Sequence, residues 1–220
     1  MKTYKDFIKE NIINKETGKP IYLADIAKGL AAEFDIPLVK AQAATSVAMK
    51  RLIDNKEIPC LRAYQKGIYY ITAITPFGET KIDKEAIIRD KYVKDGNGYE
   101  YGPYALYKLG LSTQLPNQRE IVCNNAYECR RKDKKLDVWI KPPRAVITED
   151  NKAYLMILDV IDVMEKYPVD AEKPYKLIAE HINRNNLKYD KLLALSDKHY
   201  NAGTTVKLAH VAGESGVLGS

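Results

Sequence analysis

The stretch Pro37–Ile71 reads PLVKAQAATSVAMKRLIDNKEIPCLRAYQKGIYYI. Pro37 suits the first turn of a helix, where its missing N–H costs no hydrogen bond. At about 100° per residue, one stripe of this helix collects mostly small side chains, namely Ala41, Ala44, Thr45, Ala48 and Leu52. Because small residues let a neighbouring helix pack closely, the stripe is predicted to face the core.

The opposite face of the same helix is short, polar or basic. It carries Gln42, Ala43, Ser46 and Lys50, with Lys40 beside them. Such side chains can approach base edges and phosphates. We interpret these five residues as candidate DNA contacts, although most Ala-rich amphipathic helices serve only as core helices.

Two predicted strands follow this helix, Ile58–Ala63 and Ile68–Thr72, with Gly67 in the turn between them. A helix followed at once by a hairpin is the second half of a winged helix-turn-helix. The residues expected at the hairpin tip are Arg62, Tyr64, Gln65 and Lys66. The cations Arg62 and Lys66 are candidate contacts to phosphates or a minor groove, and a solvated turn explains each of them equally well.

The residues before Pro37 complete the same motif. Apolar residues at helical spacing predict helices near residues 3–13 and 23–34, and Ile21–Tyr22 is expected to form a short strand that joins the hairpin. Three helices and a hairpin match the order of elements in a winged helix. Residues 1–75 are therefore predicted to form a winged helix-turn-helix DNA-binding domain.

The charge of the chain is unevenly distributed. The 220 residues have a formal net charge of +6. Residues 1–75 carry 12 Lys and Arg against 8 Asp and Glu, residues 76–150 carry 14 against 12, and residues 151–220 carry 9 against 9. The positive excess lies with the predicted DNA-binding domain, as a phosphate backbone requires.

The composition also bears on location. The hydrophobic content of 45% is ordinary for a globular protein, and no apolar run approaches the roughly 18 residues of a membrane span. The first residues are charged where a signal peptide needs an apolar core. We expect a cytoplasmic protein with no membrane partner.

The sequence pattern changes at Thr75–Gly78, where we place a domain boundary. Residues 76–212 are predicted to form an α/β and then helical domain, and residues 213–220 a flexible tail. The expected elements are a helix at 84–93, a helix at 99–111 opened by Pro103 and closed by Gly110, strands at 120–124 and 136–140, and helices from residue 150 onward. The predicted fold class is α+β and mostly helical, with a small α/β middle region and a helical C-terminal region.

A basic run separates the two strands of the middle region. It consists of Arg130, Arg131, Lys132, Lys134 and Lys135. We interpret it as a hairpin tip that could hold nucleic acid, RNA included, or an acidic partner protein. Basic runs of this kind lie more often in solvated loops, and a solvated loop remains the alternative interpretation.

Residues that could carry catalysis are scattered. No phosphate-cradling glycine motif is present, and His181, His199 and His210 stand singly without metal-ligand spacing. The three cysteines are interpreted as buried free thiols, and Asp159 and Asp162 as solvated carboxylates on a helix. We expect a non-enzyme with no cofactor and no metal.

Several short sequence motifs resemble those of one protein family. They are Gly67-Ile68-Tyr69-Tyr70, Thr75-Pro76-Phe77-Gly78, Gly98-Tyr99-Glu100-Tyr101-Gly102, the run from Ala105 to Pro116, and Asn124-Asn125. The most specific is Leu-Gly-Leu-Ser-Thr-Gln-Leu-Pro at 109–116. Over roughly residues 20–145 the chain resembles the AbiEi-type antitoxins of type IV toxin–antitoxin systems and their winged-helix relatives, whereas the last 70 residues are only loosely similar.

The resemblance implies a two-part protein. Its winged helix would bind an inverted repeat in double-stranded DNA upstream of its own gene and repress that promoter. The rest of the chain would counteract a toxin of nucleotidyltransferase type, without a need for a stable complex. The alternative is a winged helix that binds a protein partner and has no sequence-specific DNA binding. Val39, Ala43 and Val47, which lie near the polar face of the Pro37 helix, favour this alternative.

Overall fold

The structure is a computed structural model that describes residues 2–214. Its helices and small sheets make an α+β, mostly helical fold, which confirms the predicted class. The chain divides into two compact units, the N-terminal unit (residues 1–87) and the C-terminal unit (residues 88–220).

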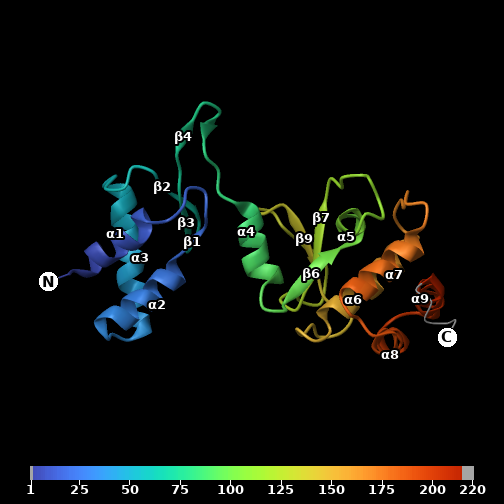
Figure 1. The fold of residues 1–220 in the computed structure, drawn as a ribbon. Helices are drawn as coiled ribbons and strands as arrows, with labels where there is room; N and C mark the ends of the chain where they lie inside the picture. The colour runs from blue at the N-terminus through green and yellow to red at the C-terminus, as the bar shows by residue number, and fades with distance from the viewer. Residues whose placement is uncertain (1, 215–220) are drawn as a thin grey trace. The chain divides into compact units, whose positions relative to one another are not determined.

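The N-terminal unit is a winged helix-turn-helix (Figure 1). Its elements are α1 (Tyr4–Ile13), β1 (Ile21–Tyr22), α2 (Leu23–Phe34), α3 (Leu38–Asp54), β2 (Leu61–Gln65) and β3 (Ile68–Ile71). The sheet is antiparallel in the order β1-β3-β2. The short strand expected at Ile21–Tyr22 pairs with β3, as predicted from the sequence.

Local chemistry explains where these helices begin and end. Thr3 and Asp6 form a reciprocal capping box at the start of α1, which satisfies two otherwise unpaired backbone N–H groups. Asp35 adopts the left-handed conformation, with φ of 50°, and turns the chain sharply from α2 into α3. Asp tolerates this conformation better than most non-glycine residues. The helices then bury Ile12, Leu30 and Met49 together in one core.

A small ribbon occupies the predicted domain boundary. β4 (Ile74–Thr75) pairs with β5 (Gly78–Glu79), so that Pro76 and Phe77 form the turn. The Thr72 hydroxyl donates to the Thr80 carbonyl at 3.0 Å and fastens the ribbon to the end of the winged-helix sheet. Further along, the Asp83 N–H donates to the Gly18 carbonyl at 2.8 Å. These bonds keep residues 76–87 with the N-terminal unit, and the division therefore falls after Ile87 rather than after residue 75.

The C-terminal unit contains a mixed four-stranded sheet and a group of helices (Figure 1). After α4 (Lys84–Ile88), which spans the division, come the π-helix η1 (Arg89–Val93), β6 (Gly98–Tyr101), α5 (Gly102–Lys108), β7 (Arg119–Cys123), β8 (Arg131–Asp133), β9 (Val138–Lys141), α6 (Lys152–Val163), α7 (Pro174–Arg184), α8 (Tyr189–His199) and α9 (Ala202–Glu214). The strand order is β6-β7-β9-β8, with β7 and β9 parallel and the other pairs antiparallel.

Several expectations for this unit were wrong. The helix predicted at 99–111 begins only at Gly102, because residues 98–101 form β6 and pair with β7. Gly213 and Glu214, predicted as tail, are the last residues of helix α9, and residues 215–220 of that tail lie outside the described residues. Cys123 is buried as expected, but Cys129 is exposed.

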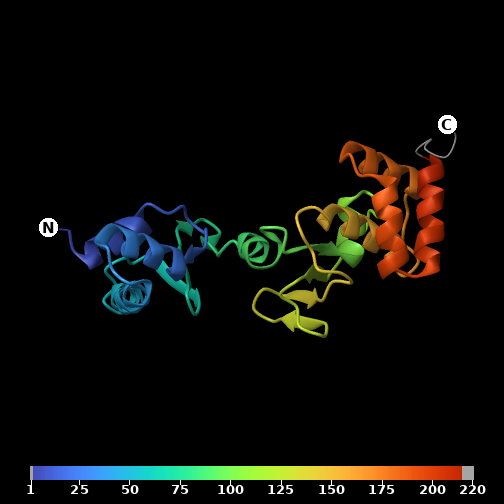
Figure 2. The same ribbon diagram turned by 90° about the horizontal axis from the view of Figure 1, so that it is seen from below.

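The helix α6 organises the core of the C-terminal unit. It packs against β6, α5, α8 and α9, and Figure 2 shows α8 and α9 side by side, with α7 packed on α9. Leu155, Leu158 and Ile161 are fully buried in the resulting core.

Asp159 and Asp162 of α6 are also buried, at 3% and 4% exposure, so the prediction of solvated carboxylates was wrong. The Tyr99 hydroxyl donates to Asp159 at 2.8 Å, and the Tyr200 hydroxyl at 3.0 Å. Burial raises the pKa of Asp159 despite these bonds. Asp162 instead accepts hydrogen bonds from Arg144 at 2.8 Å and from Lys166 at 3.1 Å.

A carboxylate on β8 holds η1 against the sheet. Asp133 accepts hydrogen bonds from Lys91 at 2.9 Å and from the Tyr92 hydroxyl at 2.8 Å. Burial acts to raise the pKa of Asp133, but the hydrogen bonds from Lys91, Tyr92 and the Leu136 N–H outweigh burial and hold the pKa at about 2. The ionised form is therefore favoured by folding.

We expect Asp133→Asn to lower the free energy of unfolding of the C-terminal unit by about 1–2 kcal/mol at pH 7. Because the folded pKa is depressed, the contribution of Asp133 is present above the unfolded pKa and is lost as pH falls through about 5 to 2. Urea unfolding at pH 7 and pH 3 measures the difference. Asp137→Asn, in the same turn but with an exposed side chain, is the control. A pH-independent difference would contradict this account.

Candidate nucleic-acid interface

The outward face of α3 carries the five predicted contact residues. Lys40, Gln42, Ala43, Ser46 and Lys50 are all exposed, while Thr45 and Met49 on the other side of the helix are fully buried. This division follows from the helical period, which turns every third or fourth residue toward α1 and α2. The structure therefore gathers these five residues on one surface.

The polar side chains of this surface are uncommitted. Among residues 2–214, no hydrogen bond or ion pair involves the side chains of Lys40, Gln42, Ser46 or Lys50. Binding through this face would therefore break no intramolecular contact of these four side chains. Their donors and acceptors are available for base edges and phosphates.

Lys66 and Arg62 differ in their surroundings. Lys66 is exposed beside Gly67 in the β2–β3 turn, and the Gly67 carbonyl accepts a 2.9 Å hydrogen bond from the Leu23 N–H at the start of α2. Arg62 was predicted at the tip but lies inside β2, paired with Tyr70. Its guanidinium donates to the Pro59 carbonyl and forms a 2.8 Å ion pair with Glu79. The prediction failed because β2 begins at Leu61, after the turn at Pro59, and so extends further toward Gly67.

An apolar groove between α1 and α3 was not predicted. It has a volume of about 470 Å³ and is lined by Tyr4, Lys5, Lys40, Ala43, Ala44, Val47, Ala48 and Arg51. Val47 is 50% exposed, and Val39 nearby on α3 is 78% exposed. The signal in the sequence was the row Val39, Ala43 and Val47 at four-residue spacing.

The basic run at 130–135 lies in the β8–β9 hairpin, and Lys134 and Lys135 are in its turn, as predicted. Arg131–Asp133 form β8, and the turn into β9 spans residues 134–137. Arg130 donates to the Glu120 carboxylate at 2.8 Å and lies over the Trp139 ring at 3.8 Å. Lys132 forms a 2.6 Å ion pair with Asp137. Part of the positive charge of the run is thus neutralised within the protein.

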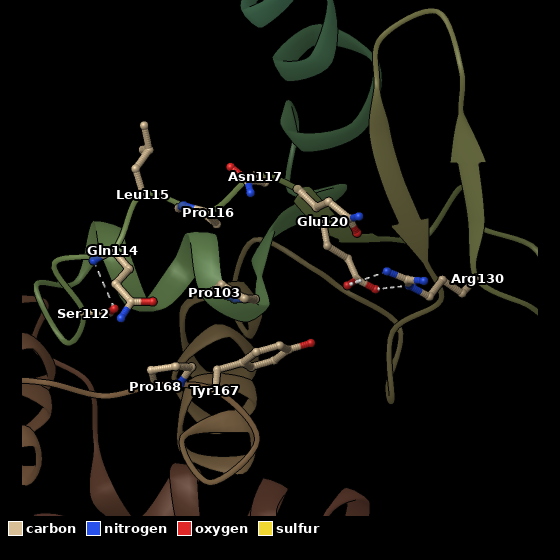
Figure 3. A pocket seen from close by; sticks show the side chains of 11 residues that line it. Pro103, Ser112, Gln114, Leu115, Pro116, Asn117, Glu120, Arg130, Tyr167 and Pro168 are labelled. Atoms are coloured by element: carbon tan, nitrogen blue, oxygen red, sulfur yellow. Dashed lines mark hydrogen bonds and ion pairs between the residues drawn. The ribbon is translucent and has the colours of Figure 1, made fainter.

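A pocket of about 380 Å³ opens in the C-terminal unit (Figure 3). Its lining residues are Pro103, Ser112, Gln114, Leu115, Pro116, Asn117, Gln118, Glu120, Arg130, Tyr167 and Pro168. The loop at 112–118 forms one side, Tyr167 and Pro168 form another, and the Glu120–Arg130 pair lies at the β7 end. Sequence analysis singled out Arg130 and the 109–116 string but did not bring them together.

The 109–116 string builds one wall of this pocket. Leu111 is fully buried in the core, and Gly110 adopts a positive φ of 71° that ends α5. The Thr113 hydroxyl donates to the Asp170 carboxylate at 2.7 Å, and the Thr113 N–H donates to the same group. These contacts fix the start of the loop, and residues 114–118 after it line the pocket.

Within residues 2–214, no group of three or more His, Cys, Asp or Glu residues is placed to hold a metal ion. No helix in that range is long and apolar enough to cross a membrane.

Comparisons with known proteins give little further information. No protein-family model matches the sequence, and no curated protein matches it. Among solved structures, the chain is similar to the RV2827C protein of Mycobacterium tuberculosis, with a TM-score of 0.46 and 11% sequence identity. The similarity covers 97% of this chain and 77% of that protein.

Proposed function

We propose that this protein is a DNA-binding transcriptional regulator whose α3 enters the major groove. The observation that carries the proposal is the exposed, uncommitted polar face of α3 within a winged helix-turn-helix. In this fold the second helix of the helix-turn-helix lies in the groove and its side chains reach base edges. The positive excess of residues 1–75 supports the same assignment.

The residues of the surface divide into two roles. Gln42, Ser46 and Lys50 face the base edges, where a glutamine amide can pair with adenine and a lysine with guanine. Lys40 and Lys66 hold phosphates and set the register of the protein on the duplex. Arg62 is a weaker candidate than predicted, because a phosphate would have to displace Glu79 from its guanidinium.

The biological role follows from the resemblance of the 67–125 strings to AbiEi-type antitoxins. In this proposal the protein acts in the cytoplasm, and two copies bind an inverted repeat upstream of its own gene and repress the promoter. The C-terminal unit counteracts a nucleotidyltransferase-like toxin. A reading frame of that kind next to the gene would support the antitoxin role, and a genome without one would count against it.

A gel-shift titration with the DNA upstream of the gene tests the DNA-binding role. We expect Gln42→Ala to lose about 1–3 kcal/mol of binding free energy at one base position of the operator. Lys40→Ala should weaken binding to all sequences about equally and lower the slope of log K against log salt by about 1.

Lys81→Ala removes the same charge from an exposed position of the N-terminal unit outside α3 and is the matched control. It should bind the operator as the wild type does, apart from a small electrostatic loss. Equal operator binding by Lys50→Glu and the wild type would refute the assignment of this face.

A second candidate function is a protein-interaction module. The α1–α3 groove favours it, because Ala43 and Val47 present apolar surface next to the proposed DNA contacts. Absence of any gel shift at low salt, with a folded protein, would favour this function over the first.

A further inference from the structure

We propose that the pocket of the C-terminal unit binds a nucleobase, presented either by a free nucleotide or by a single-stranded nucleic acid. The proposal uses only residues of the C-terminal unit. It therefore does not depend on the DNA-binding role proposed for α3, and either can fail without the other.

The pocket has the size and the rigidity of a small-molecule site. Its volume of about 380 Å³ lies within the range of roughly 300–1,000 Å³ typical of ligand pockets. The Thr113–Asp170 contacts fix the loop on one side, and the Glu120–Arg130 pair fixes the strand side. The start of the loop and the strand side are therefore held before a ligand binds, which lowers part of the entropic cost of binding.

The walls offer hydrogen-bonding groups that the fold leaves unused. Among residues 2–214, no hydrogen bond involves the side-chain amides of Gln114, Asn117 or Gln118. Each amide carries donors and an acceptor, as the edge of a nucleobase does. The Glu120 carboxylate is bound by Arg130 but keeps acceptor capacity, which suits an exocyclic amino group.

The pocket also offers flat side chains on which a nucleobase can stack. The Tyr167 ring lies beside Pro103 and Pro168 in the pocket (Figure 3). An aromatic ring stacks on any base and is the common means of holding unpaired bases. A neutral sugar could use the ring and the amides, but it has no use for the cation at the mouth.

That cation is Arg130, which is placed to receive a phosphate. Its guanidinium lines the pocket, is about half exposed, and lies over the Trp139 ring at 3.8 Å. Arg130 is paired with Glu120, so a phosphate would share its guanidinium with that carboxylate. A base in the pocket would thus leave its phosphate beside the exposed part of Arg130, whereas the Glu120 carboxylate disfavours an anion inside.

Trp139 makes the test direct, because it is the only tryptophan in the sequence and Arg130 lies on its ring. The full-length protein is titrated with AMP, with ribose 5-phosphate and with an eight-nucleotide oligoadenylate, and calorimetry repeats each titration. AMP should change Trp139 fluorescence saturably, whereas ribose 5-phosphate should not. Tighter binding of the oligonucleotide identifies a nucleic-acid strand as the source of the base, and equal binding identifies a free nucleotide.

Variants locate the site. Tyr167→Leu and Gln118→Ala should each weaken AMP binding by about tenfold. Tyr127→Leu changes an exposed tyrosine that does not line the pocket and should bind as the wild type does. If Tyr167→Leu unfolds, Gln118→Ala still decides, because its exposed side chain supports no contact of the fold.

Two results would overturn the proposal. One is the absence of any fluorescence or calorimetric response to both AMP and the oligonucleotide up to about 1 mM. The other is equal binding of ribose 5-phosphate and AMP, or unchanged AMP binding by a folded Gln118→Ala, since neither fits a base held by the pocket amides.

Discussion

Replacing Gly98 with alanine is expected to lower the free energy of unfolding of the C-terminal unit by about 3 kcal/mol or more. Gly98 begins β6, and a Cβ atom there would lie 2.2 Å from the Tyr92 carbonyl oxygen and 2.5 Å from the Val122 carbonyl oxygen. Both atoms belong to the backbone, so no side-chain rotation relieves the overlap. The strand β6 would have to move away from β7 or η1.

Urea unfolding followed by Trp139 fluorescence measures this loss in the C-terminal unit, which contains the only tryptophan. Gly213→Ala is the matched control, because a Cβ atom at that position of α9 meets nothing within 4 Å. We expect it to be neutral or slightly stabilising, since alanine is the better helix former. A loss below 1 kcal/mol for Gly98→Ala would show that the packing of β6 against η1 differs from that described.

The second large effect is expected for Arg144→Ala, at about 2–3 kcal/mol of unfolding free energy. Arg144 donates to the Asp162 carboxylate at 2.8 Å, lies 3.6 Å from Asp159 and covers the Tyr200 ring at 4.6 Å. Its removal leaves two buried carboxylates with less compensating charge. Because about a third of the Arg144 side chain is exposed, water moderates the cost relative to a fully buried pair.

The loss should depend on pH. Burial acts to raise the pKa of Asp162, but the Lys166 hydrogen bond and the Arg144 and Lys166 charges outweigh burial and lower it. A depressed folded pKa contributes stability that is present above the unfolded pKa and is lost as pH falls. The difference between Arg144→Ala and the wild type should thus shrink in acid. Arg184→Ala, at an exposed position of α7, is the control, and an equal loss there would point to net charge instead.

The fold of the N-terminal unit was predictable because its signals are local. Helical periodicity separated the buried Ala41 and Leu52 from the exposed Gln42 and Lys50 within one helix. The errors came from register. Pro59 lies in a turn rather than a strand, and this displaced the predicted position of Arg62 along the hairpin.

The C-terminal unit was harder to predict, because its polar residues find partners far along the sequence. Asp159 and Asp162 have the spacing of a solvated helix face. Asp159 is nevertheless buried, and it accepts hydrogen bonds from Tyr99 and Tyr200, which lie far from it in the sequence. The pocket was not predicted for the same reason. The 109–116 string, which begins its loop, was noticed, but Tyr167 comes from the segment after α6 and Arg130 from the residue before β8.

The order of the strands has a consequence for how the chain folds during synthesis. The sheet of the N-terminal unit is complete once Ile71 has been made, because its strand β3 ends there. In the C-terminal unit, β9 inserts between β7 and β8, and the buried Asp159 receives its last hydrogen bond from Tyr200. Long-range contacts of this kind form slowly, because a large loop must close first. The winged helix can therefore be complete while the ribosome is still adding the helices that the second core requires.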